Sequence, residues 1–145
     1  MIASTGGPPA NDRAPIAVGV DTSDESLSAL TAALQLGRRL DAPVTVVHAV
    51  GLLEEGGYRM PPAIDDFVTA ARHAAGIGEE VPVNVMREDG PAADVLTRVA
   101  GRIGATMIVV GRRGLGSAPR PLGSVSEAVL ARATTPVLVV PPAPH

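Results

Sequence analysis

The chain has 145 residues and a formal net charge of −3, and 46% of its residues are hydrophobic against 19% charged. This length and apolar content are typical of one globular domain with an ordinary core, not of a disordered chain. The single Tyr, the single Phe, the absence of Trp and the negative charge argue against nucleic-acid binding, which relies on stacking aromatics and a positive field.

The sequence contains neither cysteine nor lysine, so all 12 basic residues are arginines. This excludes disulfides, thiolate metal sites, cysteine nucleophiles and Schiff-base lysines. No apolar run approaches the roughly 20 residues that span a bilayer, and the N-terminus lacks the pattern of a secretory signal. We therefore expect a cytoplasmic protein without membrane partners.

Hydrophobic runs and helical periodicity predict five strands and four helices after a flexible N-terminal arm, residues 1–14. The folded domain is expected over residues 15–142. The strands are expected at Ile16–Val20, Val44–Val50, Val81–Arg87, Met107–Val110 and Pro136–Val140. The helices are expected from residues 21–24 to about Leu40, over Asp65–Ala75, from Gly90-Pro91 to Ile103 with Pro91 as its first residue, and over Ser124–Arg132.

This alternation predicts an α/β fold, a single domain built on a doubly wound five-stranded parallel sheet. The nearly all-apolar runs 108–110 and 137–140 are typical of strands buried on both faces. In such sheets ligands bind beyond the carboxyl ends of the strands, at a topological switch point. Asp21 and the loop after Val110 both follow strands, so we expect them to meet in one crevice.

A glycine-rich loop follows the fourth strand, with the sequence Gly111-Arg112-Arg113-Gly114-Leu115-Gly116, and Gly123-Ser124-Val125-Ser126 opens the next helix. Glycines let main-chain N–H groups approach a ligand, and a helix N-terminus attracts anions. Hydroxyl groups at Ser124 and Ser126 would donate to phosphate oxygens. We interpret this segment as a nucleotide-phosphate cradle, although glycines also serve tight turns that bind nothing.

Other polar residues have simpler interpretations beside the functional one. Asp21 would contact a nucleotide or cap the following helix, and both roles are compatible. Arginines 112, 113 and 120 would clamp phosphates, with at least one of them solvated instead. His48 ends an apolar strand without a second ligand nearby, which favours a packed, hydrogen-bonded histidine over a metal site. No Ser-His-Asp or paired-carboxylate arrangement is present, so we predict no catalytic residue and no metal site.

Several segments, in this order, resemble the universal stress protein family over almost the whole chain after Pro15. These segments are residues 20–23, 46–50, 88–92, 108–114 with 123–126, and 136–140. The resemblance implies a Rossmann-like, adenine nucleotide alpha hydrolase-like fold that binds ATP, with Mg²⁺ accompanying the phosphates, and acts in stress response or signalling. It also implies a homodimer formed through the last strand, Val137–Val140.

The resemblance further implies a set of nucleotide-binding residues. Asp21 and Val44 would lie near the adenine and ribose, and Val110 beside the base. The ribose and phosphates would face Gly111, Gly114, Gly123, Ser124, Val125 and Ser126, with Arg113 as a phosphate clamp. The family signature has nine residues between its second and third glycines, whereas eight separate Gly114 from Gly123 here.

Function therefore has three candidate interpretations. The first is a non-catalytic ATP-binding protein, at most a slow ATPase. The second is a nucleotide-free interaction protein of the same fold, which the shortened loop makes plausible. The third is an adenylating enzyme of the ATP pyrophosphatase type, because residues 21–26 are faintly similar to the loop of those enzymes.

Overall fold

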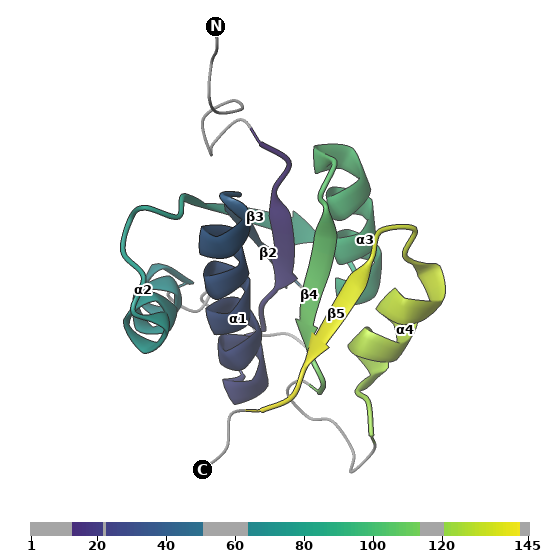
Figure 1. Cartoon of the computed structure of the whole chain (residues 1–145). Helices are drawn as coiled ribbons and strands as arrows, with labels where there is room; N and C mark the ends of the chain where they lie inside the picture. Colours follow the sequence, from purple (N-terminus) through teal and green to yellow (C-terminus); the bar gives the residue numbers. More distant parts are fainter. Residues whose placement is uncertain (1–12, 22, 51–63, 114–120, 143–145) are drawn as a thin grey trace, which may run out of the picture.

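The structure, a computed structural model, describes residues 13–21, 23–50, 64–113 and 121–142. Over these residues five parallel strands form one sheet in the order β3-β2-β1-β4-β5 (Figure 1). The strands are β1 (Ile16–Gly19), β2 (Val44–Val50), β3 (Val83–Asp89), β4 (Met107–Gly111) and β5 (Val137–Val140). The helices are α1 (Asp24–Leu40), α2 (Ile64–Ala75), α3 (Ala92–Ile103) and α4 (Ser124–Arg132). The predicted fold class is confirmed. Residues 1–12 of the predicted N-terminal arm lie outside the described residues.

The two faces of the sheet carry separate cores because successive strand residues point to opposite sides. Helices α1 and α2 cover one face, where Ile16 and Val46 are buried among Leu30 and Leu34 of α1. Helices α3 and α4 cover the other face, around Ile108 and its buried neighbours (Figure 1). Helices α1 and α3 each bury an apolar stripe against one side of the sheet, whereas α2 packs mainly on α1.

Except for β3, the predicted elements agree with the structure to within one residue at each end, and three differences remain. Strand β3 begins at Val83 and not at Val81, because Pro82 has no N–H to give to the ladder and offers only its carbonyl, to Val44 N–H at 2.9 Å. Pro91 is the N-cap of α3, with a non-helical ψ of 139°, so it precedes the helix that we expected it to begin.

Strand β5 is the third difference. We expected it to be buried on both faces, but it lies at the edge of the sheet and its residues are half-buried or exposed. Edge position leaves one side of the strand without a neighbouring strand among the described residues. The apolar sequence of β5 therefore does not mean that the strand is fully buried, whereas the similar sequence of β4, inside the sheet, belongs to a largely buried strand.

The chain order places a topological switch point between β1 and β4. From β1 the chain winds outward through β2 to β3, then crosses back to β4 and winds the other way to β5. The connections after β1 and β4 leave toward opposite faces, which opens a crevice at the carboxyl ends of these two strands. None of the helices in the described ranges is long and apolar enough to cross a membrane.

An ion-pair cluster fixes α3 to the carboxyl end of β3. Glu88 accepts hydrogen bonds from Arg102, and its Oε1 lies 3.3 Å from Arg98 Nη2. The hydrogen bond from Arg102 is the main cause that lowers the pKa of the Glu88 carboxyl below its ordinary value of 4.5. The same pair raises the pKa of Arg102.

Candidate functional site

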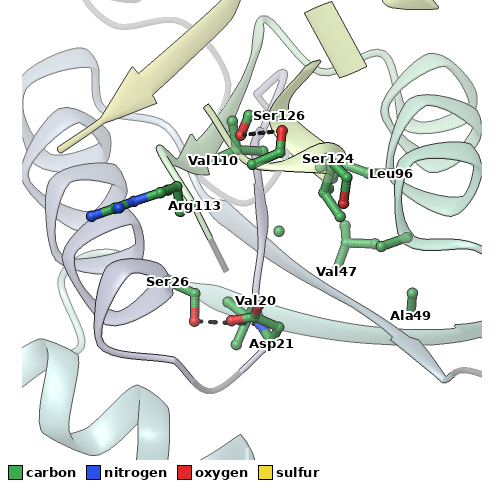
Figure 2. A pocket seen from close by; sticks show the side chains of 15 residues that line it. Val20, Asp21, Ser26, Val47, Ala49, Leu96, Val110, Arg113, Ser124 and Ser126 are labelled. Carbon is green, nitrogen blue, oxygen red and sulfur yellow. Dashed lines mark hydrogen bonds between the residues drawn. The ribbon is translucent and has the colours of Figure 1, made fainter. Parts of the chain in front are cut away.

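A pocket opens at the predicted place, beyond the carboxyl ends of β1, β2 and β4 (Figure 2). The beginnings of α1, α3 and α4 complete its walls. Its lining consists of Gly19, Val20, Asp21, Ser26, Val47, Ala49, Ala92, Leu96, Val110, Gly111, Arg113, Gly123, Ser124, Val125 and Ser126. Eight of the ten residues predicted for the site are in this set, so the sequence located the pocket correctly.

Part of the pocket lining, which we call the apolar half, consists of apolar residues. Val47 and Ala49 of β2, Val110 of β4 and Leu96 of α3 line it, with Gly19 of β1 beneath them. A Cβ at Gly19 would lie 2.9 Å from Leu96 Cδ2, so the absence of a side chain there lets Leu96 approach the sheet. Uncharged walls of this kind suit a flat, largely apolar group such as a nucleobase.

The other half presents the N-terminus of α4. Gly123 is the N-cap of α4 and has no side chain to cap the helix. Its own N–H donates a hydrogen bond to the Arg112 carbonyl at 2.8 Å. The first helical hydrogen bond runs from Glu127 N–H to Gly123 O at 3.0 Å. Within the described ranges, the preceding amides of Ser124, Val125 and Ser126 therefore have no protein acceptor. Such orphan donors and the helix dipole favour an anion.

The two serines of this helix have different roles, contrary to our expectation that both hydroxyls face phosphate. Ser126 is buried and its Oγ donates to the Arg112 carbonyl at 2.7 Å, so its hydroxyl belongs to the fold. Ser124 is exposed, and no residue in the described part of the chain binds its hydroxyl. Only Ser124 therefore has a hydroxyl ready for a ligand.

Asp21 does not cap α1 itself, as we had considered, but holds Ser23, which does. Its Oδ1 accepts from the N–H of Ser23 at 3.0 Å and from the Ser23 hydroxyl at 2.5 Å. Ser23 is the N-cap of α1 and accepts from Ser26 N–H at 3.1 Å. Asp21 also lines the pocket, so its structural role leaves contact with a ligand open.

Gly111 and Arg113 reach the pocket wall but are held by α1. A Cβ at Gly111 would lie 2.8 Å from the Glu25 carbonyl oxygen, so this glycine is required by close packing against the α1 backbone. The Arg113 side chain extends toward α1 in Figure 2, and its Nε lies 3.4 Å from Glu25 Oε2. The clamp that we expected from Arg113 is thus engaged with Glu25. Gly114 and Arg120 lie outside the described residues.

The placement of Val44 near the adenine is wrong. Val44 lies at the amino end of β2, pairs with Ile16 at the start of β1, and is fully buried in the α1 core. Val47, three residues further along the strand and beside Gly19, lines the pocket instead. The sequence could have indicated Val47, because ligands bind at the carboxyl end of a parallel strand and the side chains of a strand alternate in direction.

The sequence analysis also missed several apolar and small lining residues, namely Gly19, Val20, Ser26, Ala49, Ala92 and Leu96. These carry no chemical signature, and their contribution depends on which strand ends and helix starts meet. The predicted packing of His48 is confirmed, because its Nδ1 lies 2.9 Å from the Val20 carbonyl oxygen. No group of three His, Cys, Asp or Glu side chains within the described ranges is arranged to hold a metal ion.

Comparison with known proteins gives the pocket its context. The family model described as the universal stress protein family matches residues 13–141. The chain belongs to the universal stress protein family. A universal stress protein of Mycolicibacterium smegmatis is 33% identical over 138 residues, covering 86% of this chain and 47% of that protein. This chain therefore spans about half the length of that relative.

Other universal stress proteins match over most of their length. One from Methanocaldococcus jannaschii is 31% identical over 136 residues, covering 86% of this chain and 80% of the relative. The crystal structure of a universal stress protein in complex with cAMP is 30% identical with a TM-score of 0.68, covering 90% of this chain and 98% of that one. A universal stress protein of Archaeoglobus fulgidus in complex with dAMP, 24% identical with a TM-score of 0.64 over 88% and 98% of the two chains, shows the same fold.

Proposed function

We propose that this universal stress protein binds an adenine nucleotide in the pocket between β1, β4 and α4. The observation that carries the proposal is a single pocket lined both by apolar side chains and by the anion-attracting start of α4. The apolar half would take the base against Val47, Val110 and Leu96, and the amides that begin α4 would take phosphate oxygens. The similar universal stress protein that was crystallised with cAMP supports this assignment.

Among adenine nucleotides we propose ATP, with Mg²⁺ held through its phosphate oxygens. The support is the run of glycine and hydroxyl residues at 111, 114, 123 and 124, which resembles the signature of ATP-binding family members. The Ser124 hydroxyl and three helix-start amides supply uncharged donors to a charged ligand, which form the stronger class of hydrogen bond. These donors approach from one side, so the phosphates would lie against the N-terminus of α4.

We further propose that the protein acts by binding and signalling rather than by turnover, in a stress response. Three of its polar pocket residues are engaged in the fold: Asp21 with Ser23, Arg113 with Glu25, and Ser126 with the Arg112 carbonyl. A side chain fixed in this way stabilises the pocket walls. Nucleotide binding would then change the surface around the pocket, and with it the interactions of the protein with partners.

A proline at position 124 tests the phosphate end directly. Ser124 is the first residue of α4, a position that favours proline, and Gly123 has the extended ψ of 168° that a following proline requires. Ser124→Pro therefore removes one amide donor and the hydroxyl with little cost to the helix, whereas Ser124→Ala removes the hydroxyl alone. We expect calorimetric titration to show that S124P weakens ATP binding about tenfold or more, and S124A less.

The titrations also separate the competing interpretations. Unchanged ATP affinity in S124P would place the phosphates elsewhere. Failure of the wild-type protein to bind ATP, AMP or cAMP would favour the nucleotide-free interaction protein. Release of AMP or pyrophosphate from ATP in the presence of carboxylate substrates would favour the adenylating enzyme.

We also propose that two copies pair through β5. Within the described ranges this strand pairs with β4 alone, so its outer edge keeps free main-chain donors and acceptors. Leu138 of β5 and Leu130 of α4 are 39% and 46% exposed and add apolar surface that such pairing would cover. Light scattering should give a dimer mass for the wild type and a monomer mass for Leu138→Lys, and a monomeric wild type would contradict the proposal.

A further inference from the structure

We propose that Glu25 is a positioning residue for the nucleotide site, one that sets the phosphate-binding end without contacting the nucleotide. This inference rests on the proposed function. Glu25 lies in the first turn of α1, whereas the phosphate-binding amides begin α4. Residues 111–113, which we call the loop base, follow β4 and contact the first turns of both helices.

Glu25 holds the loop base by three contacts. Its Oε1 accepts from the Arg113 main-chain N–H at 3.1 Å, and its Oε2 lies 3.4 Å from Arg113 Nε. Its backbone packs so closely on Gly111 that a Cβ there would lie 2.8 Å from the Glu25 carbonyl oxygen. The Glu25 side chain is only 16% exposed, so solvent screens these contacts weakly.

The loop base in turn holds the first turn of α4. The Arg112 carbonyl accepts from Gly123 N–H at 2.8 Å and from Ser126 Oγ at 2.7 Å, while Arg112 N–H donates to Val140 O at 2.9 Å. A displacement of Arg113 is therefore transmitted through Arg112 to the helix start. The Arg113 N–H that meets the carboxylate and the Arg112 carbonyl that receives both α4 groups belong to the same planar peptide unit.

The same contacts direct the Arg113 guanidinium toward α1 and away from Ser124 (Figure 2). Glu25 therefore determines which described groups meet the phosphates: amides and the Ser124 hydroxyl, and not Arg113. Loss of the carboxylate would loosen the loop base and leave the apolar half of the pocket, around Val47 and Leu96, unchanged. Binding of the nucleoside would then survive while binding of its phosphate would weaken.

The experiment compares Glu25→Ala and Glu25→Gln with the matched control Asp24→Ala. Asp24 is the other acidic residue in the first turn of α1, and it is exposed. Asp24→Ala therefore removes one negative charge near the helix N-terminus, as Glu25→Ala does, but breaks none of the contacts described above. Calorimetry with adenosine, AMP and ATP should show that E25A weakens AMP and ATP binding about tenfold and leaves adenosine nearly unchanged. E25Q should recover most of the loss, because its amide oxygen still accepts the Arg113 N–H.

A readout that needs no nucleotide accompanies the titrations. The NMR amide resonances of Arg113, Gly123 and Ser124 should shift in E25A and stay in place in D24A. Unmoved α4 amides, equal losses for adenosine and AMP, or a gain in AMP affinity would each overturn the positioning role. If the amides shift in E25A but the wild-type protein binds no adenine nucleotide, the proposed function is refuted and Glu25 is an organiser of the loop base alone.

Discussion

The Ser126 hydroxyl donates a 2.7 Å hydrogen bond to the Arg112 carbonyl oxygen, joining the first turn of α4 to the chain that leaves β4. The same carbonyl accepts the Gly123 N–H at 2.8 Å. A single carbonyl oxygen, that of Arg112, therefore holds both the N-cap and the first turn of α4. The buried serine that resembles a phosphate ligand in the sequence is a structural residue in the fold.

Ser126→Ala should destabilise the protein by about 1 kcal/mol, because one internal hydrogen bond is lost while Gly123 N–H still satisfies the Arg112 carbonyl. Urea unfolding monitored by circular dichroism measures this change. Ser124→Ala is the matched control, since Ser124 is exposed, and we expect a change within about 0.5 kcal/mol. Equal stabilities of the two variants would contradict the structural role of Ser126.

Gly111→Ala should destabilise by about 1–3 kcal/mol, because its Cβ would meet the Glu25 backbone at 2.8 Å and a main-chain shift is required. Gly101→Ala on α3 provides the contrast. Open space surrounds that position in the helix, so the substitution should stabilise by about 0.5–1 kcal/mol. Thermal melts of both variants would show opposite signs, and a neutral G111A would disprove the close contact.

Val44→Ala and Val47→Phe should separate core from pocket. Removing two methyl-sized groups at fully buried Val44 should cost about 2 kcal/mol and leave nucleotide affinity intact. A phenyl group at Val47 would occupy the apolar half of the pocket and weaken adenosine binding. Calorimetric titration of folded V44A and V47F checks this, and a V44A variant with impaired binding would reinstate Val44 as a site residue.

The Glu88 cluster should give stability a measurable dependence on pH. Hydrogen bonding by Arg102 lowers the folded-state pKa of Glu88 below 4.5, so its contribution is present above that value and is lost as pH falls through the folded-state pKa. Glu88→Gln should therefore be less stable than wild type at neutral pH, with the difference vanishing in acid. Urea titrations across this range measure it. A difference that persists in strong acid would assign the effect to packing.

Strands and helices were predictable because their signals are local. The β2 run Val44–Val50 and the helix Ser124–Arg132 were predicted with the bounds that the structure gives. The predicted start of β3 was two residues too early. Val81 is buried and apolar like a strand residue, but the strand begins only after Pro82. The glycine-rich loop located the site because the carboxyl ends of parallel strands carry ligands in this class of fold.

Side-chain roles at the site were not predictable in the same way. Ser124 and Ser126 look alike in the sequence, yet one is exposed and the other is buried on the Arg112 carbonyl. Arg113 resembles a phosphate clamp until Glu25, 88 positions earlier, is found beside it. Each difference arises from a contact between segments that are distant along the chain.

By itself, the sequence determined the order of elements, the parallel sheet and the neighbourhood of the pocket, because hydrophobic periodicity and glycine placement act within a few residues. Tertiary structure decided which groups face the pocket. The β1–β2 register places Val47, not Val44, beside Gly19, and packing of α1 on β4 turns Arg113 toward Glu25. Register and helix packing are properties of the assembled sheet, so no single segment encodes them.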